Sequence, residues 1–363
     1  MTSETVRQAA AMPDMNHRDP AFVEILRDTK DRLLGVYPQL TEGEFGWPGR
    51  REKQPMQRGD AWKPYLIGGS GTAAVEAMIT SCIFKGPVLL IDSGYYSGRM
   101  RSKLKAHGID YDVLSTESWL APIDLGALFD KTEDPIHGPP YEAVLTTHNE
   151  TTTGRLHDLK AIGHICDDNN TKLLVDAMSS FGADDIDFTH VDAIASSANK
   201  CLHGLPGLSF VLVRDWLAAE MKTYPPRTVY LSLPFYEGDS PPLTPPVPIL
   251  NALRQALIEM GPGGAAERGE TYRRRAAILR EGLTDLGFTF AIPESEMSCT
   301  LTTASIPKGW RVDEWSRANL DAGFMIYETK GELSERCFQV ANMGELGEEQ
   351  FYAWLRAVAR IVA

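Results

Sequence analysis

Short apolar segments alternate with helical ones through the middle of the chain. The apolar segments lie at residues 65–67, 88–91, 143–147, 172–175, 193–196 and 208–213, and the helical segments begin near Thr72, Gly98, Asp158 and Asp215. Each apolar segment is continuous rather than alternating, which is typical of parallel strands that helices cover on both faces. The pattern predicts an α/β fold with a large, mostly parallel sheet flanked by helices.

The segments on either side of this region predict further parts. At 363 residues the chain exceeds the usual size of one domain. Asp19 and Pro20 supply a cap and a first-turn proline for a long helix, and short strands alternate with helices from Phe288 onward. We expect an N-terminal segment with this helix (1–40), a basic insertion rich in glycine and proline (41–62), a large domain (63–248), linking helices (249–287) and a small C-terminal α+β domain (288–363).

Charge and cysteine content narrow the class of protein. The formal net charge of −13 argues against nucleic acid or an anionic membrane as the main partner. Residues 1–12 lack the basic start and apolar run of a signal peptide, and no segment approaches the ~20 apolar residues of a membrane span. The five cysteines are scattered without C-x-x-C spacing, which favours reduced thiols over disulfides or a metal site. We expect a cytoplasmic protein.

A lysine stands in the turn between two of the apolar segments. Lys200 follows the segment that ends near Ala195 and precedes the one that begins at Leu208. Lysine is usually exposed unless it is paired or reactive. Partial burial favours the free amine, which can condense with an aldehyde. An exposed loop lysine is the alternative interpretation.

A carboxylate follows a neighbouring apolar segment. Asp176 comes directly after residues 172–175, at the carboxyl end of a predicted parallel strand, where open α/β sheets bind ligands. Enzymes that use pyridoxal phosphate need a lysine that binds the aldehyde and an acid that keeps the ring nitrogen protonated. Asp176 together with Lys200 therefore predicts a pyridoxal phosphate site.

A glycine-rich turn offers a place for the phosphate group. Ser70, Gly71 and Thr72 follow a predicted strand and open a helix. Backbone N–H groups at a helix start, together with the helix dipole, bind anions. The turn lacks the Gly-Lys-Ser/Thr ending of a P-loop and is not a G-x-G-x-x-G sequence, so a nucleotide site is the weaker interpretation.

Five motifs together resemble one enzyme family. They are NHRDP at 16–20, GSGTAAVEAM at 69–78, ETTTG at 150–154, DAMSSFG at 176–182 and SSANKCLHGLP at 196–206. The chain resembles the fold-type I, class V pyridoxal-phosphate-dependent aminotransferases of the alanine–glyoxylate branch. Within that branch it is most similar to the 2-aminoethylphosphonate–pyruvate aminotransferases. The resemblance implies the fold-type I architecture, with a large sheet domain and a small C-terminal domain.

The resemblance also implies roles for individual residues. Tyr96 would stack on the pyridine ring, with Tyr95 as its alternative, and Thr152 or, failing that, Thr151 would bind the phenolic oxygen. Each could instead be a core tyrosine or a threonine-rich turn. Asn199, beside the lysine, would contact the phosphate. Thr244 would reach into the phosphate site of the neighbouring subunit of a homodimer, unless it is a loop threonine without a role.

The chain departs from the resembled family in a late strand. Enzymes of this branch hold an acid group of the substrate with an arginine in a pattern like Phe-Arg-Ile-Gly, where this chain has Gln339. A neutral amide cannot copy the charged, bidentate grip of a guanidinium. We expect altered substrate recognition at Gln339, with Arg50, Arg51 or Arg58 of the basic insertion taking over anion binding. A solvated loop is the plain alternative for that insertion.

These features predict an enzyme and its partners. The resemblance implies a pyridoxal-phosphate-dependent aminotransferase that moves an amino group from a small amine or amino acid, of the 2-aminoethylphosphonate kind, to a 2-oxo acid such as pyruvate. Two alternatives stay open. One is a lyase or elimination enzyme with the same cofactor, and the other is a non-catalytic protein of the same fold that binds a ligand or partner.

Overall fold

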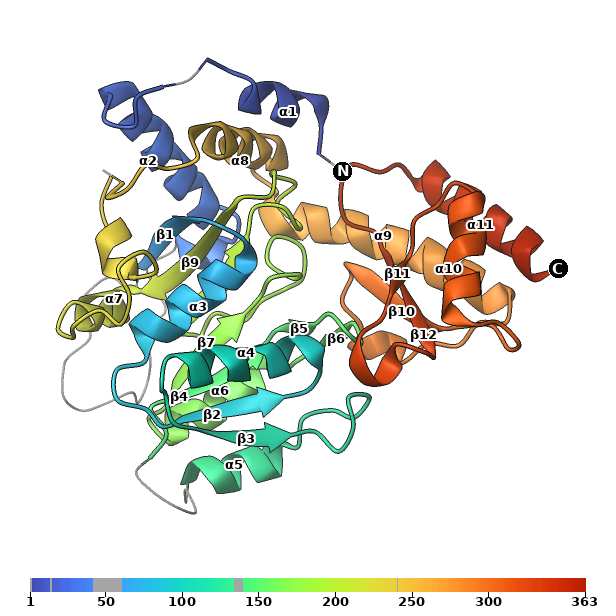
Figure 1. Cartoon of the computed structure of the whole chain (residues 1–363), viewed down its shortest axis with the longest axis horizontal. Helices are drawn as coiled ribbons and strands as arrows, with labels where there is room; N and C mark the ends of the chain where they lie inside the picture. Colours follow the sequence, from blue (N-terminus) through green and yellow to red (C-terminus); the bar gives the residue numbers. More distant parts are fainter. Residues whose placement is uncertain (1, 14, 42–60, 134–139, 240) are drawn as a thin grey trace.

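The computed structural model describes residues 2–13, 15–41, 61–133, 140–239 and 241–363. This part of the chain is built around a seven-stranded sheet with the order β1–β9–β8–β7–β4–β2–β3 (Figure 1). Strands β8, β7, β4, β2 and β3 are parallel, and β9 is antiparallel to both of its neighbours. The strands are β1 (Trp62–Gly68), β2 (Val88–Asp92), β3 (Tyr111–Ser115), β4 (Ala143–Thr147), β7 (Lys172–Asp176), β8 (Ala193–Ser197) and β9 (Leu208–Arg214). The predicted mostly parallel sheet is confirmed.

Helices pack against both faces of this sheet (Figure 1). Strand β2 shows why its sequence is continuously apolar. Leu89 and Ile91 belong to one buried layer, and Val88 and Leu90 belong to the other, because successive side chains of a strand face opposite sides. The first layer holds α2 (Pro20–Leu34), α5 (Leu125–Glu133), α6 (Leu159–Asp168) and α8 (Val247–Met260), and the second holds α3 (Gly71–Cys82), α4 (Tyr95–Ala106) and α7 (Asp215–Met221).

A smaller unit follows at the carboxyl end of the chain. Helix α9 (Gly264–Asp285) leads to a three-stranded antiparallel sheet of β10 (Leu301–Ser305), β12 (Cys337–Ala341) and β11 (Tyr327–Glu328). Helices α10 (Val312–Asp321) and α11 (Glu348–Val362) pack on it around Trp315, Phe338 and Trp354, which are buried. In Figure 1 this unit is drawn in orange and red beside the large sheet.

Buried polar contacts join the two units. The Asp184 carboxylate, in the large unit, accepts hydrogen bonds from Ser298 Oγ at 2.6 Å and from the Cys299 N–H at 2.9 Å. The Ser298 N–H in turn donates to the Gly154 carbonyl at 2.8 Å. These bonds hold the entry to the small unit against the turn that contains residues 150–154.

Some elements differ from the sequence-based expectation. Strand β3 and helix α5 were not expected. Strand β3 lies at the sheet edge, and only Leu114 of its residues is buried. The strand expected at 288–291 is absent from the described structure, where Phe290 makes only a single bridge to Ala304. The remaining elements are α1 (Glu4–Ala10), β5 (Asn149–Glu150), β6 (Arg155–Leu156) and 3₁₀ turns at Pro38–Leu40, Leu233–Tyr236, Glu294–Glu296 and Gly331–Leu333.

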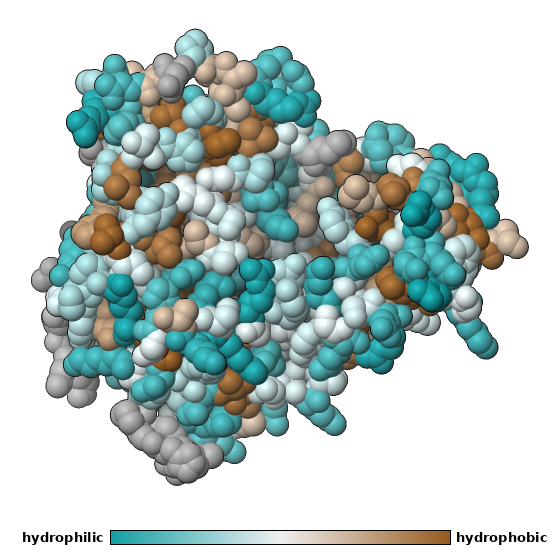
Figure 2. Space-filling view, viewed as in Figure 1, coloured by the Kyte–Doolittle hydropathy of each residue, from teal (hydrophilic) through white to brown (hydrophobic). Residues whose placement is uncertain are grey.

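The predicted divisions at residues 40, 62, 248 and 287 stay a prediction, and residues 42–60 of the expected insertion lie outside the described residues. Within the described ranges, no helix is long and apolar enough to cross a membrane. All five cysteines are buried and none forms a disulfide. On the face drawn in Figure 2, hydrophobic residues lie in separate patches among hydrophilic ones.

Candidate active site

A cavity of about 380 Å³ opens at the carboxyl ends of β4, β7 and β8. This is the edge at which parallel sheets bind ligands. The cavity also takes in the start of α3 and one face of α4. Seven of the residues predicted from the sequence line it together: Ser70, Gly71, Thr72, Tyr96, Asp176, Asn199 and Lys200.

Lys200 lies in the turn that follows β8 and is partly buried. The turn is held by backbone hydrogen bonds, including the Gly204 N–H to the Ala198 carbonyl at 2.8 Å. A further bond, from the Gly69 N–H to the Gly207 carbonyl at 2.9 Å, ties this turn to the segment before α3. The lysine and the predicted anion site are therefore parts of one connected wall.

Asp176 ends β7 and presents its carboxylate to the cavity. Its Oδ1 accepts a hydrogen bond from the Met178 N–H at 2.9 Å, and no described cation forms an ion pair with it. Burial raises the pKa of the Asp176 carboxyl to about 6, opposed in part by the Met178 N–H. A half-buried carboxylate without a cationic partner is the group that a protonated ring nitrogen would satisfy.

The start of α3 is suited to an anion. The hydroxyl of Ser70, the N-cap residue, makes no bond to the helix, and Gly69 before it has a φ of 151°, a conformation that glycine tolerates best. The first N–H groups of a helix lack acceptors within it and attract negative charge. Arg99 adds a cation beside them by donating to Thr72 Oγ1 at 3.4 Å. This combination fits a phosphate group.

The cavity is also lined by residues that the sequence reasoning missed. Thr147 Oγ1 and Asn149 Oδ1 are buried and have no hydrogen-bond partner in the described structure, so they are free to bind a ligand. Arg99 and Lys103 line it from α4, and burial, helped by the neighbouring Arg99, lowers the pKa of the Lys103 ammonium. Arg99 and Lys103 follow Tyr96 at helical spacing. The sequence pattern placed the start of this helix near Gly98 rather than at Tyr95, so it did not put these residues on one helix face with Tyr96.

The structure distinguishes between the two threonines of the ETTTG motif. Thr151 lines the cavity, and its Oγ1 lies 2.7 Å from Ser179 Oγ. The hydroxyl of Thr152 faces away, donating to Glu150 Oε1 at 2.6 Å and accepting from the Tyr95 N–H at 3.2 Å. The predicted contact to a ring oxygen is untested, and Thr151, the second choice from the sequence, is the better placed of the two.

Other predicted residues lie elsewhere. Thr244 is exposed and borders a separate hollow beside Tyr230. Gln339 does not line the cavity. Its Nε2 donates to the carbonyls of Thr151 and Thr152 and to Thr303 Oγ1. The arginines predicted to bind an anion, Arg50, Arg51 and Arg58, lie outside the described residues.

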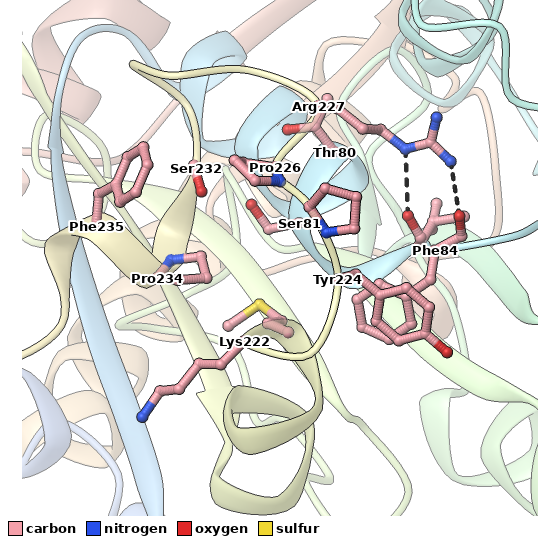
Figure 3. A pocket seen from close by; sticks show the side chains of 13 residues that line it. Thr80, Ser81, Phe84, Lys222, Tyr224, Pro226, Arg227, Ser232, Pro234 and Phe235 are labelled. Atoms are coloured by element: carbon pink, nitrogen blue, oxygen red, sulfur yellow. Dashed lines mark hydrogen bonds between the residues drawn. The ribbon is translucent and has the colours of Figure 1, made fainter.

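A second cavity, of about 480 Å³, contains none of the predicted residues (Figure 3). Its wall includes the stacked rings of Phe84 and Tyr224, 4.1 Å apart, and Arg227, which donates to the Ile83 and Phe84 carbonyls. Among the residues that the structure describes, no carboxylate lines it. Acid–base chemistry therefore places the candidate active site in the smaller cavity.

Comparisons with known proteins point to one enzyme family. A family model described as Aminotransferase class-V matches residues 129–238. A 2-aminoethylphosphonate–pyruvate transaminase of Bacteroides fragilis is 30% identical over 365 residues, covering 96% of this chain and 93% of that protein. The solved alanine–glyoxylate aminotransferase of a Nostoc species matches with a TM-score of 0.85 and 26% identity, over 100% of this chain and 93% of that one. A ureidoglycine–glyoxylate aminotransferase of Bacillus subtilis matches with a TM-score of 0.86 and 22% identity, over 99% and 90%.

The raised pKa of Asp176 predicts a pH-dependent stability in the protein without ligand. The carboxyl holds its proton more tightly in the folded state, where its pKa is about 6, than at the ordinary value of 3.8. The stabilisation is fully present below 3.8 and is lost as the pH rises through about 6, by roughly 3 kcal/mol in total. Asp176→Asn, which never ionises, should gain that margin over the unmodified protein between pH 4 and pH 7. Urea unfolding of both proteins measures it, and a difference that is constant with pH would contradict the assigned environment.

Proposed function

The chain belongs to the class V, pyridoxal-phosphate-dependent aminotransferases, and we propose that it moves the amino group of a small amine, of the 2-aminoethylphosphonate kind, to a 2-oxo acid such as pyruvate. The observation that carries this proposal is the joint position of Lys200 and Asp176 on one cavity that begins at the start of α3. The relative from Bacteroides fragilis, named for this pair of substrates, supports the choice of donor and acceptor.

The residues present fit pyridoxal phosphate. Asp176 lacks a cation, and Thr147 Oγ1 and Asn149 Oδ1 lack hydrogen-bond partners in the described structure. The start of α3 and Arg99 would hold the phosphate group. When bound, the cofactor supplies an aldehyde that can exchange one amine for another and a cationic ring that withdraws electrons.

Each residue then has a defined task. Lys200 would hold the aldehyde through Nζ and, once the substrate amine has displaced it, its amine would take the proton from the substrate carbon and deliver it to the former aldehyde carbon. Asp176 would keep the ring nitrogen protonated, and Tyr96 would cover the ring face. Thr151 would donate its hydroxyl to the ring oxygen.

Substrate recognition is proposed to differ from that of the resembled enzymes. The amide of Gln339 has two N–H donors and three acceptors around it, so it has no donor left for a substrate acid group. Among the described residues, the cations that line the cavity are Arg99, Lys103 and Lys200. We propose that Arg50, Arg51 or Arg58 supplies the charge that Gln339 does not.

The active unit is proposed to be a homodimer without nucleic acid or membrane partners. Thr244 is exposed and does not line the cavity of its own chain, as expected of a residue that serves the partner's phosphate site. Large apolar side chains nearby are also exposed: Val229, Tyr230, Phe235 and Leu243. Their burial between two copies would remove apolar area from water.

Lys200→Ala tests the covalent role. The variant should lose the visible absorbance of the bound cofactor and all measurable amino transfer, because no other amine replaces Nζ. Lys105→Ala, which removes an exposed lysine of α4, should keep both. Absorbance spectra and a coupled assay for the carbonyl product measure the effect. Turnover by the Lys200→Ala protein, or ammonia release without any need for a 2-oxo acid in the unmodified protein, would contradict an aminotransferase that acts through Lys200.

Gln339→Arg tests the altered recognition of the acid group. Each charge-assisted hydrogen bond contributes ~1.5–3 kcal/mol, so kcat/KM for 2-aminoethylphosphonate should rise roughly tenfold or more relative to that for an uncharged amine such as propylamine. The ratio of the two donors corrects for any loss caused by breaking the bonds to the Thr151 and Thr152 carbonyls. An unchanged ratio would mean that residue 339 does not face the acid group of the donor.

Mixing two defective variants tests the shared site. Thr244→Val should weaken cofactor binding, and Lys200→Ala should be inactive. In a mixed dimer, the chain that keeps Lys200 receives Thr244 from its partner, so one complete site forms. At limiting cofactor, unfolding and refolding the two variants together should restore activity that neither shows alone, in a particle of twice the 40.1 kDa chain mass. A monomer by sedimentation, or no restoration, would rule out the proposal.

A further inference from the structure

Glu150 is a fully buried carboxylate that no assignment above uses. It ends β5, and its side chain is 0% exposed. Oε1 accepts hydrogen bonds from the N–H of Tyr96 at 3.3 Å, the N–H of Thr152 at 3.1 Å and the hydroxyl of Thr152 at 2.6 Å. Oε2 accepts one from the N–H of Ser97 at 2.9 Å. Four donors therefore converge on one carboxylate, and no described cation pairs with it.

Two of these donors belong to the first turn of α4. The residue before the helix, Gly94, has no side chain to cap it, and the first turn contains no acidic residue. Glu150 supplies the missing acceptor and the negative charge that a helix start favours. The approach is close, because a Cβ added at Gly94 would lie 2.5 Å from the Glu150 carboxyl carbon. Glycine at this position leaves room for the carboxylate.

The other two donors belong to the turn that carries Thr151. Glu150 thus joins the two walls of the cavity: α4, which presents Tyr96, Arg99 and Lys103, and the 151–152 turn, which presents Thr151. Glu150 itself does not line the cavity, so it makes no direct contact with a ligand there. Its negative charge also contributes to the raised pKa of Asp176, after the larger effect of burial.

We propose that Glu150 is a positioning residue of this aminotransferase, whose buried carboxylate fixes the start of α4 and the 151–152 turn so that Tyr96 stays against the ring face and Thr151 stays within reach of the ring oxygen. The inference rests on the proposed function. It requires that the cavity binds pyridoxal phosphate with Tyr96 against the ring.

Glu150→Gln tests the inference, because the amide keeps the size of the side chain but turns one acceptor into a donor that faces N–H groups. Misplacing a group that contacts the reacting ligand costs roughly 10- to 100-fold. We expect the affinity of the ligand-free protein for pyridoxal phosphate to fall by about that factor. The visible circular dichroism of the bound cofactor should weaken, and kcat should fall more than KM for the donor rises. Unchanged affinity, dichroism and kcat would overturn the inference.

Asp158→Ala is the matched control. Asp158 caps α6, its Oδ1 accepting from the Ala161 N–H at 2.9 Å, and it does not line the cavity. This variant should lower the thermal midpoint but leave cofactor affinity and dichroism unchanged. Equal losses of cofactor affinity and dichroism in both variants would mean that Glu150 contributes only to general stability, and would overturn the inference.

Gly94→Ala provides a second route if Glu150→Gln does not fold. The new methyl group would displace the carboxylate while leaving it in the chain, and it should reproduce the loss of affinity and dichroism. Normal values in this variant would overturn the inference. If the unmodified protein itself binds no pyridoxal phosphate, the proposed function fails first, which separates the two failures.

Discussion

The site is organised around one uncompensated charge: the carboxylate of Asp176 at the end of β7. It is half-buried at the edge of the cavity, it receives a hydrogen bond from the Met178 N–H, and no described cation pairs with it. Leaving such a group without a cation costs free energy in the empty protein. A ligand with a protonated ring nitrogen recovers that free energy on binding. The parallel sheet makes this possible, because it brings the ends of β4, β7 and β8 to one edge, where Lys200 completes the cavity.

The large sheet could be predicted from the sequence because its central strands are apolar at every position. Strand β2 places Leu89 in one buried layer and Leu90 in the other. Burial on both faces requires apolar residues at successive positions, and the sequence shows that pattern directly. Strand β3 could not be recognised in this way. It lies at the edge of the sheet, pairs only with β2 and buries only Leu114, so its sequence resembles that of a loop. The order of the strands in the sheet could not be predicted either, because it depends on tertiary pairing and not on any local sequence pattern.

The candidate site divides in the same way. Residues within contiguous motifs, such as Ser70, Asp176 and Lys200, were predictable because a short turn fixes where each side chain points. Lys103 was not, because its place on the cavity depends on the helical register from Tyr96, and the first N–H groups of α4 donate to Glu150, which is distant in the sequence. The choice between Thr151 and Thr152 likewise depends on which hydroxyl Glu150 binds, a contact that no spacing reveals.

The same turn also explains what Gln339 does in this chain. An arginine there would present a charged fork to a substrate, whereas the amide donates to the carbonyls of Thr151 and Thr152 from the small unit. Glu150 binds the N–H and hydroxyl of Thr152 from the other side. The donors of the 151–152 turn therefore bind Glu150 and its carbonyl acceptors bind Gln339, so groups from two different parts of the fold hold this turn. Gln339 of the small unit thus helps to hold the wall of the cavity that carries Thr151, so the position of that wall depends on both units through one loop.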